Sequence, residues 1–171
     1  MTQIIRASVD DAELLAHVAR ESFLQSHGDS ADPETVDAYV NAKFSPGEMQ
    51  KELAEPKNIY SIIYSDERPA GYSKIVLNVP HANIDVKNVT KLDRIYLLEN
   101  FIHLKLGTEL LQFNIHLSKQ QEQAGMWLYV WKQNPRAYMF YLRNGFQVIG
   151  SYDFHLSPTH ANPNHQMLLR Y

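Results

Sequence analysis

Apolar side chains recur at helical spacing over residues 106–117, and this stretch organises the rest of the chain. Intervals of three and four residues place such side chains on one face of a helix. The stripe consists of Leu106, Leu110, Leu111, Phe113, Ile115 and Leu117. Residues 91–98 alternate polar and apolar side chains and then become fully apolar, as a central strand can. We therefore expect a strand over residues 91–98 that leads through a short connection into a long helix.

The rest of the chain predicts strands and helices in an irregular order. Strands are expected where β-branched and aromatic residues are frequent, over residues 2–7, 59–64, 70–79, 126–131, 146–156 and 165–171. Helices are expected where a capping side chain precedes acidic residues or a proline, after Ser8, Asp32, Ser45 and Asn134. Residues 157–164 are expected to form a loop. This order predicts an α/β chain with a mixed sheet. A Rossmann domain is a poorer match, because no Gly-x-Gly-x-x-Gly sequence follows the first strand.

Composition narrows the class of protein. A chain of 171 residues is long enough for one domain with one sizeable core. The net charge of −3 provides no basic field that would hold nucleic acid or an anionic membrane. Cysteine is absent, which excludes disulfides and thiolate chemistry and is compatible with a cytoplasmic location. No apolar run is long enough to cross a bilayer, and the first residues do not resemble a signal peptide.

The junction between the expected strand and helix is a candidate phosphate site. Such a junction directs free helical N–H groups at the space beyond the end of the strand, where an anion can bind. Lys105 is expected in the first turn of the helix, where it would add a positive charge, and His103 is a second candidate contact. From these residues alone, a purely structural junction is an equal alternative.

Three segments resemble the GCN5-related N-acetyltransferases, and within them the PaiA-type polyamine acetyltransferases. Residues 94–97 leading into residues 106–111 are similar to the family's acetyl-CoA motif. Residues 127–131, followed by Asn134, form the second segment. Residues 134–146 are the most specific, because they fit Asn-x-x-Ala-x-x-(Phe/Leu)-Tyr-x-x-x-Gly-Phe at every defined position. The resemblance covers essentially the whole chain.

The resemblance implies a fold, a cosubstrate and an acceptor. The expected fold is a single N-acetyltransferase domain over residues 1–171, with a mostly antiparallel mixed sheet of about seven strands flanked by helices. Acetyl-CoA is the implied donor, no metal is implied, and the acceptor is a primary amine, with polyamines as candidates. The protein would be a monomer or a homodimer. The implied cofactor-binding residues are Ile95, Tyr96, Leu97, His103, Leu104, Lys105, Leu106, Gly107, Thr108, Asn134 and Arg143.

Two side chains are candidates for proton transfer within this resemblance. Tyr141 matches the family's general acid, and a phenol with a pKa of about 10 carries a proton that a leaving thiolate can take. Asp93 could remove the amine proton through a water molecule. The thioester carbonyl would be held by backbone N–H groups at residues 95–98. Without the resemblance, Tyr141 is interpreted as an ordinary core or surface tyrosine, Asp93 as a structural or solvated residue, and Asn134 as a helix cap.

The phosphate loop departs from the family pattern. The family's loop reads (Gln/Arg)-x-x-Gly-x-(Gly/Ala), and of the aligned positions Ile102, Lys105 and Gly107 only the last conforms. Lys105 could supply affinity through its charge while crowding the pyrophosphate. A non-catalytic acyl-CoA-binding regulatory module is the alternative that this departure suggests. An acetyltransferase that acts on a protein N-terminus or lysine is a further alternative.

Histidines and acidic residues outside these motifs are given structural interpretations. His155, His160 and His165 lack the spacing of a compact metal site and are expected in loops and strands. Four acidic residues could line a polyamine site but are expected to form a solvated face. They are Glu21, Asp29, Asp32 and Glu34.

Overall fold

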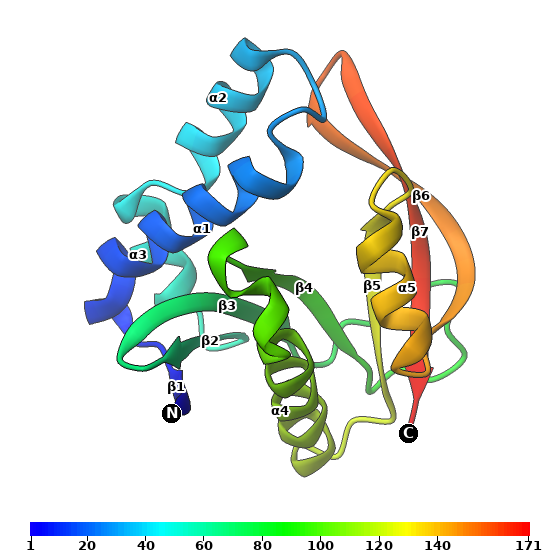
Figure 1. Ribbon diagram of the computed structural model, residues 1–171. Coiled ribbons are helices and arrows are strands. Elements are labelled where there is room, and N and C mark those ends of the chain that lie inside the picture. The colour runs from blue at the N-terminus through cyan, green and yellow to red at the C-terminus, as the bar shows by residue number, and fades with distance from the viewer. The chain divides into compact units, whose positions relative to one another are not determined.

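The computed structural model describes residues 1–171, and its elements follow the expected order (Figure 1). The strands are β1 (Thr2–Arg6), β2 (Asn58–Ser65), β3 (Arg68–Val76), β4 (Thr90–Leu97), β5 (Gly125–Trp131), β6 (Gln147–Ser157) and β7 (His160–Arg170). The helices are α1 (Ala12–His27), α2 (Pro33–Lys43), α3 (Pro46–Ala54), α4 (Leu106–Gln120) and α5 (Pro135–Arg143), with 3-10 turns η1 (Val9–Asp11) and η2 (Glu99–Leu104).

The seven strands form one mixed sheet in the order β1-β2-β3-β4-β5-β7-β6. The pairs β1–β2, β5–β7 and β6–β7 are antiparallel, whereas β4 and β5 are parallel. This arrangement confirms the expected α/β class and the mixed sheet. A parallel pair needs a crossover connection, which η2 and α4 supply between β4 and β5.

The chain divides into two compact units, and the first comprises Met1–Ile75 and Arg94–Asn114. On one face of its strands, Ile63 and Ala70 pack with Leu106 and Leu110 of α4, which confirms the apolar stripe as a core face. The other face carries aromatic side chains that meet α1, as Tyr96 of β4 does at His27. Strand β4 therefore serves two layers through its alternating side chains.

The second unit comprises Val76–Asp93 and Ile115–Tyr171. Helix α5 lies against β5, and β5, β7 and β6 run side by side (Figure 1). A cluster of Ile84, Val89, Trp127 and Leu168 forms an apolar core in which Trp127 is only 3% exposed. The indole N–H of Trp127 donates to the carbonyl of Val79 at 2.9 Å, so its one polar atom is satisfied.

The expected helix caps are present. Asp32 accepts from the N–H of Thr35, Ser45 from that of Glu48, and each is followed by a proline at the start of the helix. Ser8 forms a capping box with Asp11, although the first turn is 3-10 and α1 begins only at Ala12. These caps were predictable because their signals lie within four residues of the helix start.

The C-terminal hairpin differs from the expected loop over residues 157–164. Strand β7 begins at His160, and its pairing with β6 runs from Ser157↔His160 to Gln147↔Leu168. Pro163 lies within β7 although a proline cannot donate a ladder hydrogen bond. It is tolerated because β7 pairs with β5 only from Asn164 onward, while the carbonyl of Pro163 accepts from Lys132 N–H at 2.9 Å.

The start of α4 also differs, because the helix begins at Leu106 and Lys105 precedes it. Lys105 ends η2 with φ 59° and ψ 10°, which is the left-handed conformation. The expectation that Lys105 lies in the first turn was therefore wrong.

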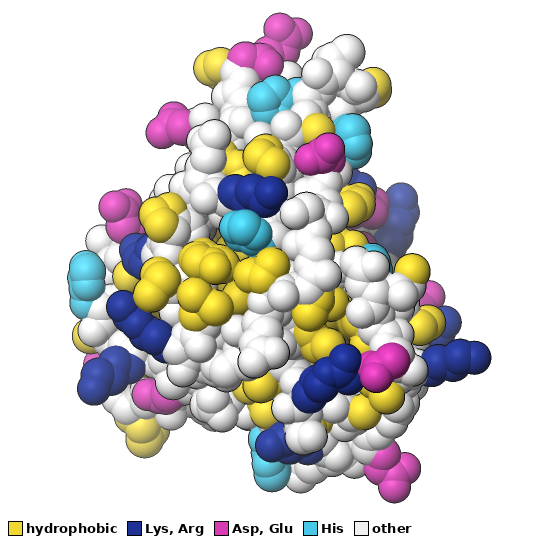
Figure 2. All heavy atoms as spheres, turned by 90° about the vertical axis from the view of Figure 1, so that its right-hand side faces the viewer, with side chains coloured by type: hydrophobic (Ala, Val, Ile, Leu, Met, Phe, Trp, Pro, Cys, Tyr) yellow, Lys and Arg dark blue, Asp and Glu magenta, His cyan; other side chains and the backbone are white.

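Figure 2 looks at the side of the molecule that bears α5, β6 and β7, and it shows hydrophobic side chains gathered on that side. The large apolar side chains of these elements that are exposed are Met139 at 42%, Val148 at 43% and Tyr152 at 43%. Lysine and arginine side chains are scattered over the same side rather than concentrated in one patch (Figure 2).

Candidate active site

The predicted cofactor-binding residues of β4, η2 and α4 all lie in the first unit. Ile95, Tyr96 and Leu97 are half-buried on β4, and Leu106 is buried with 2% of its surface exposed. Because the side chain of Leu106 is part of the apolar core, only its backbone can serve a ligand. His103, Leu104, Lys105 and Thr108 are exposed, and Gly107 is half-buried.

The backbone hydrogen bonds of α4 begin at the carbonyl of Lys105. The first bonds of α4 run from the N–H groups of Thr108 and Glu109 to the carbonyl of Lys105, at 3.0 and 3.3 Å. The N–H groups of Leu106 and Gly107 come before these bonds, at the positive end of the helix dipole. Lys105 lies in the left-handed conformation, which glycine adopts without the strain that a Cβ atom brings.

Strand β3 approaches the predicted thioester-binding stretch of β4 through a glycine. A Cβ atom at Gly71 would collide with the carbonyl of Tyr96 and lie 3.0 Å from the Cα of Leu97. The N–H of Leu98 donates to the carbonyl of Ala70 at 2.8 Å, which ties the end of β4 to β3. The backbone of residues 96–98 is therefore held closely on one side.

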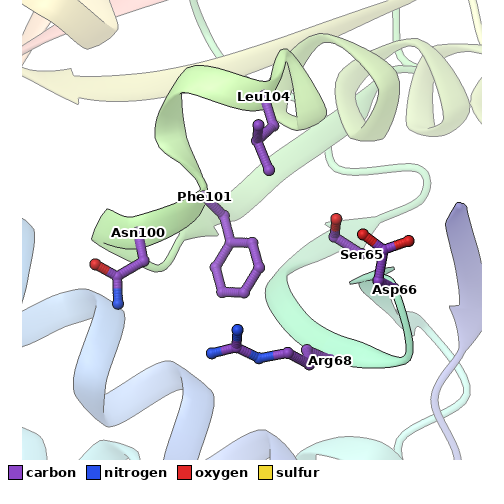
Figure 3. Close-up of a pocket in the computed structure, with 6 residues that line it drawn as sticks. All are labelled: Ser65, Asp66, Arg68, Asn100, Phe101 and Leu104. Atoms are coloured by element: carbon purple, nitrogen blue, oxygen red, sulfur yellow. The ribbon is translucent and has the colours of Figure 1, made fainter.

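A hollow of about 360 Å³ lies between the β2–β3 turn and η2 (Figure 3). Its lining residues are Ser65, Asp66, Arg68, Asn100, Phe101 and Leu104. The guanidinium of Arg68 lies 5.4 Å from the centre of the Phe101 ring, and Asp66 forms an ion pair with the N-terminal ammonium group. Of the predicted cofactor-binding residues, only Leu104 lines this hollow.

The second unit holds the remaining predicted residues. The Asn134 side chain accepts from the N–H of Ala137 at 3.1 Å, which confirms it as the cap of α5. Tyr141 is 7% exposed, and its ring meets Phe146 edge-on at 5.6 Å. Gly145 ends the helix with φ +90°, as the Asn144-Gly145 sequence predicts, and Arg143 is exposed in the last turn.

Asp93, the candidate general base, is engaged in an ion pair. Its Oδ1 lies 2.9 Å from Nζ of Lys91, and the two side chains are 21% and 27% exposed. Lys91 and Asp93 are two residues apart on β4, so both side chains point to the same face of the sheet. The carboxylate is thus partly accessible and already holds an ammonium group.

A charged network in the first unit was not anticipated from the sequence. The Glu52 carboxylate accepts from Lys74 Nζ and from the Tyr60 hydroxyl through the same oxygen, Oε2, both at 2.6 Å. Arg94 of β4 donates to the Tyr60 oxygen at 3.0 Å and lies over the ring of Phe44. A lysine in the middle of an apolar strand is the signal that could have indicated this network.

Burial and charge pairing shift the pKa of Glu52 in opposite directions. Burial alone would raise the pKa of Glu52, but the hydrogen bonds from Lys74 and Tyr60 and the nearby positive charges hold it below its ordinary value. Burial raises the pKa of Tyr60, so this phenol stays protonated. The network consists of two cations and one anion. Its hydrogen bond from Arg94 to Tyr60 holds the side chain of Arg94, the residue that precedes Ile95 on β4.

The four acidic residues near the N-terminus lie at the surface. Glu21, Asp29, Asp32 and Glu34 are all exposed, as expected of a solvated face. Asp32 is occupied as a cap, where the hydrogen bonds from the Thr35 hydroxyl and N–H lower its pKa. The three C-terminal histidines lie in β6 and β7, so the part of the expectation that assigned them to loops was wrong.

The chain belongs to the acetyltransferase (GNAT) family, whose pattern matches residues 15–146. This membership confirms the expected enzyme class. A spermidine N(1)-acetyltransferase from Thermoplasma acidophilum is 26% identical over 150 residues, which are 85% of this chain and 88% of that protein.

Solved structures agree in fold. The PaiA N-acetyltransferase from Thermoplasma acidophilum, crystallised with coenzyme A, superposes with a TM-score of 0.79 at 24% identity, covering 100% of this chain and 99% of that one. The ribosomal-protein-S18-alanine N-acetyltransferase from Escherichia coli superposes with a TM-score of 0.71 at 16% identity, covering 99% and 94%.

No group of three or more histidine, aspartate or glutamate side chains is arranged to hold a metal ion. No helix combines the length and the apolar character that crossing a membrane requires.

Proposed function

We propose that this protein transfers an acetyl group from acetyl-CoA to a small primary amine, and that residues 1–171 act as one N-acetyltransferase domain. A polyamine is the first acceptor to test, because a relative at 26% identity is a spermidine N(1)-acetyltransferase. The observation that carries the proposal is the placement of two motif residues on α5. Asn134 caps this helix, and Tyr141 lies on its buried side. A cytoplasmic location and a monomeric or homodimeric state remain predictions.

The residues before and at the start of α4 fit the pyrophosphate of coenzyme A. The N–H groups of Leu106 and Gly107 supply donors at a helix N-terminus, and Lys105 and His103 are exposed beside them. The side chain of Thr108 is exposed in the same first turn and adds a hydroxyl donor. Backbone N–H groups at Ile95–Leu97 would hold the thioester carbonyl, and Asn134 and Arg143 would contact the rest of the cofactor.

The reaction needs two proton positions on the protein. Acetyl-CoA supplies the acetyl group as a thioester; a bond forms from the amine nitrogen to the carbonyl carbon as the carbon–sulfur bond breaks. One proton leaves the nitrogen and one is added to the sulfur. Tyr141 holds a proton on its phenol oxygen at neutral pH and is the proposed donor to sulfur. Asp93 is the proposed acceptor of the amine proton, through a water molecule.

The experiment that tests this proposal replaces Tyr141 with phenylalanine. Removing the phenol proton should lower turnover by about 10²-fold or more, within the range of general acid catalysis, while coenzyme A binding stays near normal. Acetylation of spermidine and of simple alkylamines would be followed by detecting the released thiol. Tyr138→Phe is a matched control, because Tyr138 lies on the same helix with its ring 4.9 Å from His165. Equal turnover in Tyr141→Phe and the wild type would remove Tyr141 from the mechanism.

The altered phosphate loop keeps a second function open, namely a non-catalytic acyl-CoA-binding module. Calorimetric titration with acetyl-CoA and with free coenzyme A distinguishes the two. Micromolar binding together with acetylation of an amine supports the enzyme. Micromolar binding with no turnover over a broad panel of amines supports the module, and no binding up to millimolar concentration contradicts both. Activity only on a peptide N-terminus or lysine would assign a protein acceptor instead.

A further inference from the structure

Lys91 occupies a site whose chemistry is that of an ammonium receptor. Its Nζ lies 2.9 Å from Oδ1 of Asp93, 5.4 Å from the centre of the Trp127 ring and 5.6 Å from that of Tyr129. A carboxylate combined with two aromatic rings is the arrangement that proteins use to bind organic cations. We define Asp93, Trp127 and Tyr129 as the ammonium box.

The box follows from strand register. Strands β4 and β5 are parallel with Lys91 opposite Trp127, so these two side chains stand on the same face. Asp93 and Tyr129 are each two residues further along their strands and return to that face. All four side chains therefore lie on one face of the sheet in the second unit, and Lys91 is the flexible member among them.

The aromatic walls of the box are held by contacts that do not involve Lys91. Trp127 is fixed by its hydrogen bond to the carbonyl of Val79, and Tyr129 stacks on Tyr152 with ring centres 4.3 Å apart. His81 accepts from the N–H of Asn83 at Nδ1, which leaves the proton on Nε2 to donate to the Tyr129 oxygen at 3.1 Å. Removal of Lys91 would therefore leave the rings in place.

The occupant is held less firmly than the walls. Lysine has a long flexible stem and a strongly hydrated ammonium, and 27% of the Lys91 side chain is exposed. A partly exposed ion pair is worth little, so a second ammonium group can compete for the same carboxylate and rings.

We propose that the ammonium box binds the amino group of the acceptor, and that Lys91 fills it until an acceptor displaces it. As a statement about the acceptor this rests on the proposed function, whereas binding of an ammonium group does not. Lys91 then determines specificity, because an amine must outcompete a tethered ammonium. Asp93 would hold the incoming ammonium before accepting its proton. The ligand class is a primary alkylammonium ion.

The test measures binding of n-butylammonium and of spermidine without coenzyme A, by tryptophan fluorescence and by calorimetry. Lys91→Met keeps the length and apolar stem of the side chain and removes the charge. Its dissociation constant for n-butylammonium should fall about tenfold, in line with a vacated cation–π and carboxylate site. Asp93→Asn added to Lys91→Met should reverse this gain. Lys119→Met is the control, because Lys119 also lies over a tyrosine ring, 5.1 Å from that of Tyr171, and its loss should change nothing.

A measurement on the wild type tests the proposal even if a variant fails to fold. Ring currents from Trp127 and Tyr129 should displace the NMR signals of the Lys91 ε-methylene group, and n-butylammonium should return them to ordinary lysine positions. Unchanged affinity in a folded Lys91→Met, or unmoved Lys91 signals at saturating amine, overturns the proposal. Amine binding without acetylation would support the ammonium box and refute the proposed function. Acetylation of an amine whose affinity does not depend on Lys91 would support the proposed function and refute the ammonium box.

Discussion

Replacing Lys105 with glycine and, in a second variant, with alanine separates the backbone strain at this position from the effect of the lysine charge. Lys105 has φ 59°, a conformation that costs a residue with a Cβ atom about 1 kcal/mol relative to glycine. It is also exposed at the start of α4, where its charge is proposed to face the pyrophosphate. Glycine removes both the strain and the charge, whereas alanine removes only the charge.

The expected magnitudes follow from this difference. Alanine keeps the left-handed strain, so the free energy of unfolding of Lys105→Ala should be close to that of the wild type. Lys105→Gly should be more stable than Lys105→Ala by about 1 kcal/mol, reduced somewhat by the extra freedom of glycine in the unfolded chain. For a chain of this size, that difference corresponds to roughly 2–4 °C in Tm. Both variants should bind coenzyme A several-fold more weakly than the wild type at low salt.

The assays are urea unfolding for stability and calorimetry for coenzyme A, at low and high salt. The loss of affinity should shrink at about 1 M salt, where the Debye length is only about 3 Å. Glu122 provides a matched control, because it also has a positive φ, of 55°, but lies beyond α4. Glu122→Gly should be more stable than Glu122→Ala without altering coenzyme A binding. Equal stability of Lys105→Gly and Lys105→Ala would refute the strain argument, and unchanged affinity in both would refute the role of the charge.

Three further predictions concern stability. Burial lowers the pKa of His27 from 6.5 to about 4, so between these pH values the unfolded chain binds the extra proton. The free energy of unfolding should therefore fall by on the order of 3 kcal/mol as pH drops through this window, and His27→Phe should flatten that part of the urea-measured pH profile; an equally steep profile would contradict it. Glu52→Ala should cost about 3 kcal/mol in urea unfolding, because Lys74 loses its carboxylate partner in a nearly buried position, and Lys74→Met in the same chain should recover most of it; an additive double variant would argue against coupling. Asn134→Ala should lower the free energy of unfolding by about 1 kcal/mol through loss of the α5 cap, and no change would mean that the cap is not formed in solution.

Much of the fold could be predicted because its signals are local. The caps at Asp32, Ser45 and Asn134, the stripe of α4 and the stop at Gly145 each depend on residues within a few positions of one another. The candidate site could be proposed from the sequence as a set of segments for the same reason, since the motif over residues 134–146 is contiguous. The prediction that Pro163 lies in a loop was wrong, because β7 has only β6 as a partner at this position and can therefore accept a proline. Where β5 ends beside β7 depends on the tertiary structure.

The sequence by itself determined the α/β class, the order of the elements and the segments that carry acetyltransferase motifs, because periodicity and capping act over single turns and strands. Tertiary structure decided which side chains meet. The register of β4 on β5 puts Lys91 beside Trp127, and no pattern along the chain specifies that register. Folding likewise brings Glu52 to Lys74 across two elements. Charge pairing and ring contacts depend on distance in space, and for these residues only the packing of the strands and helices sets that distance.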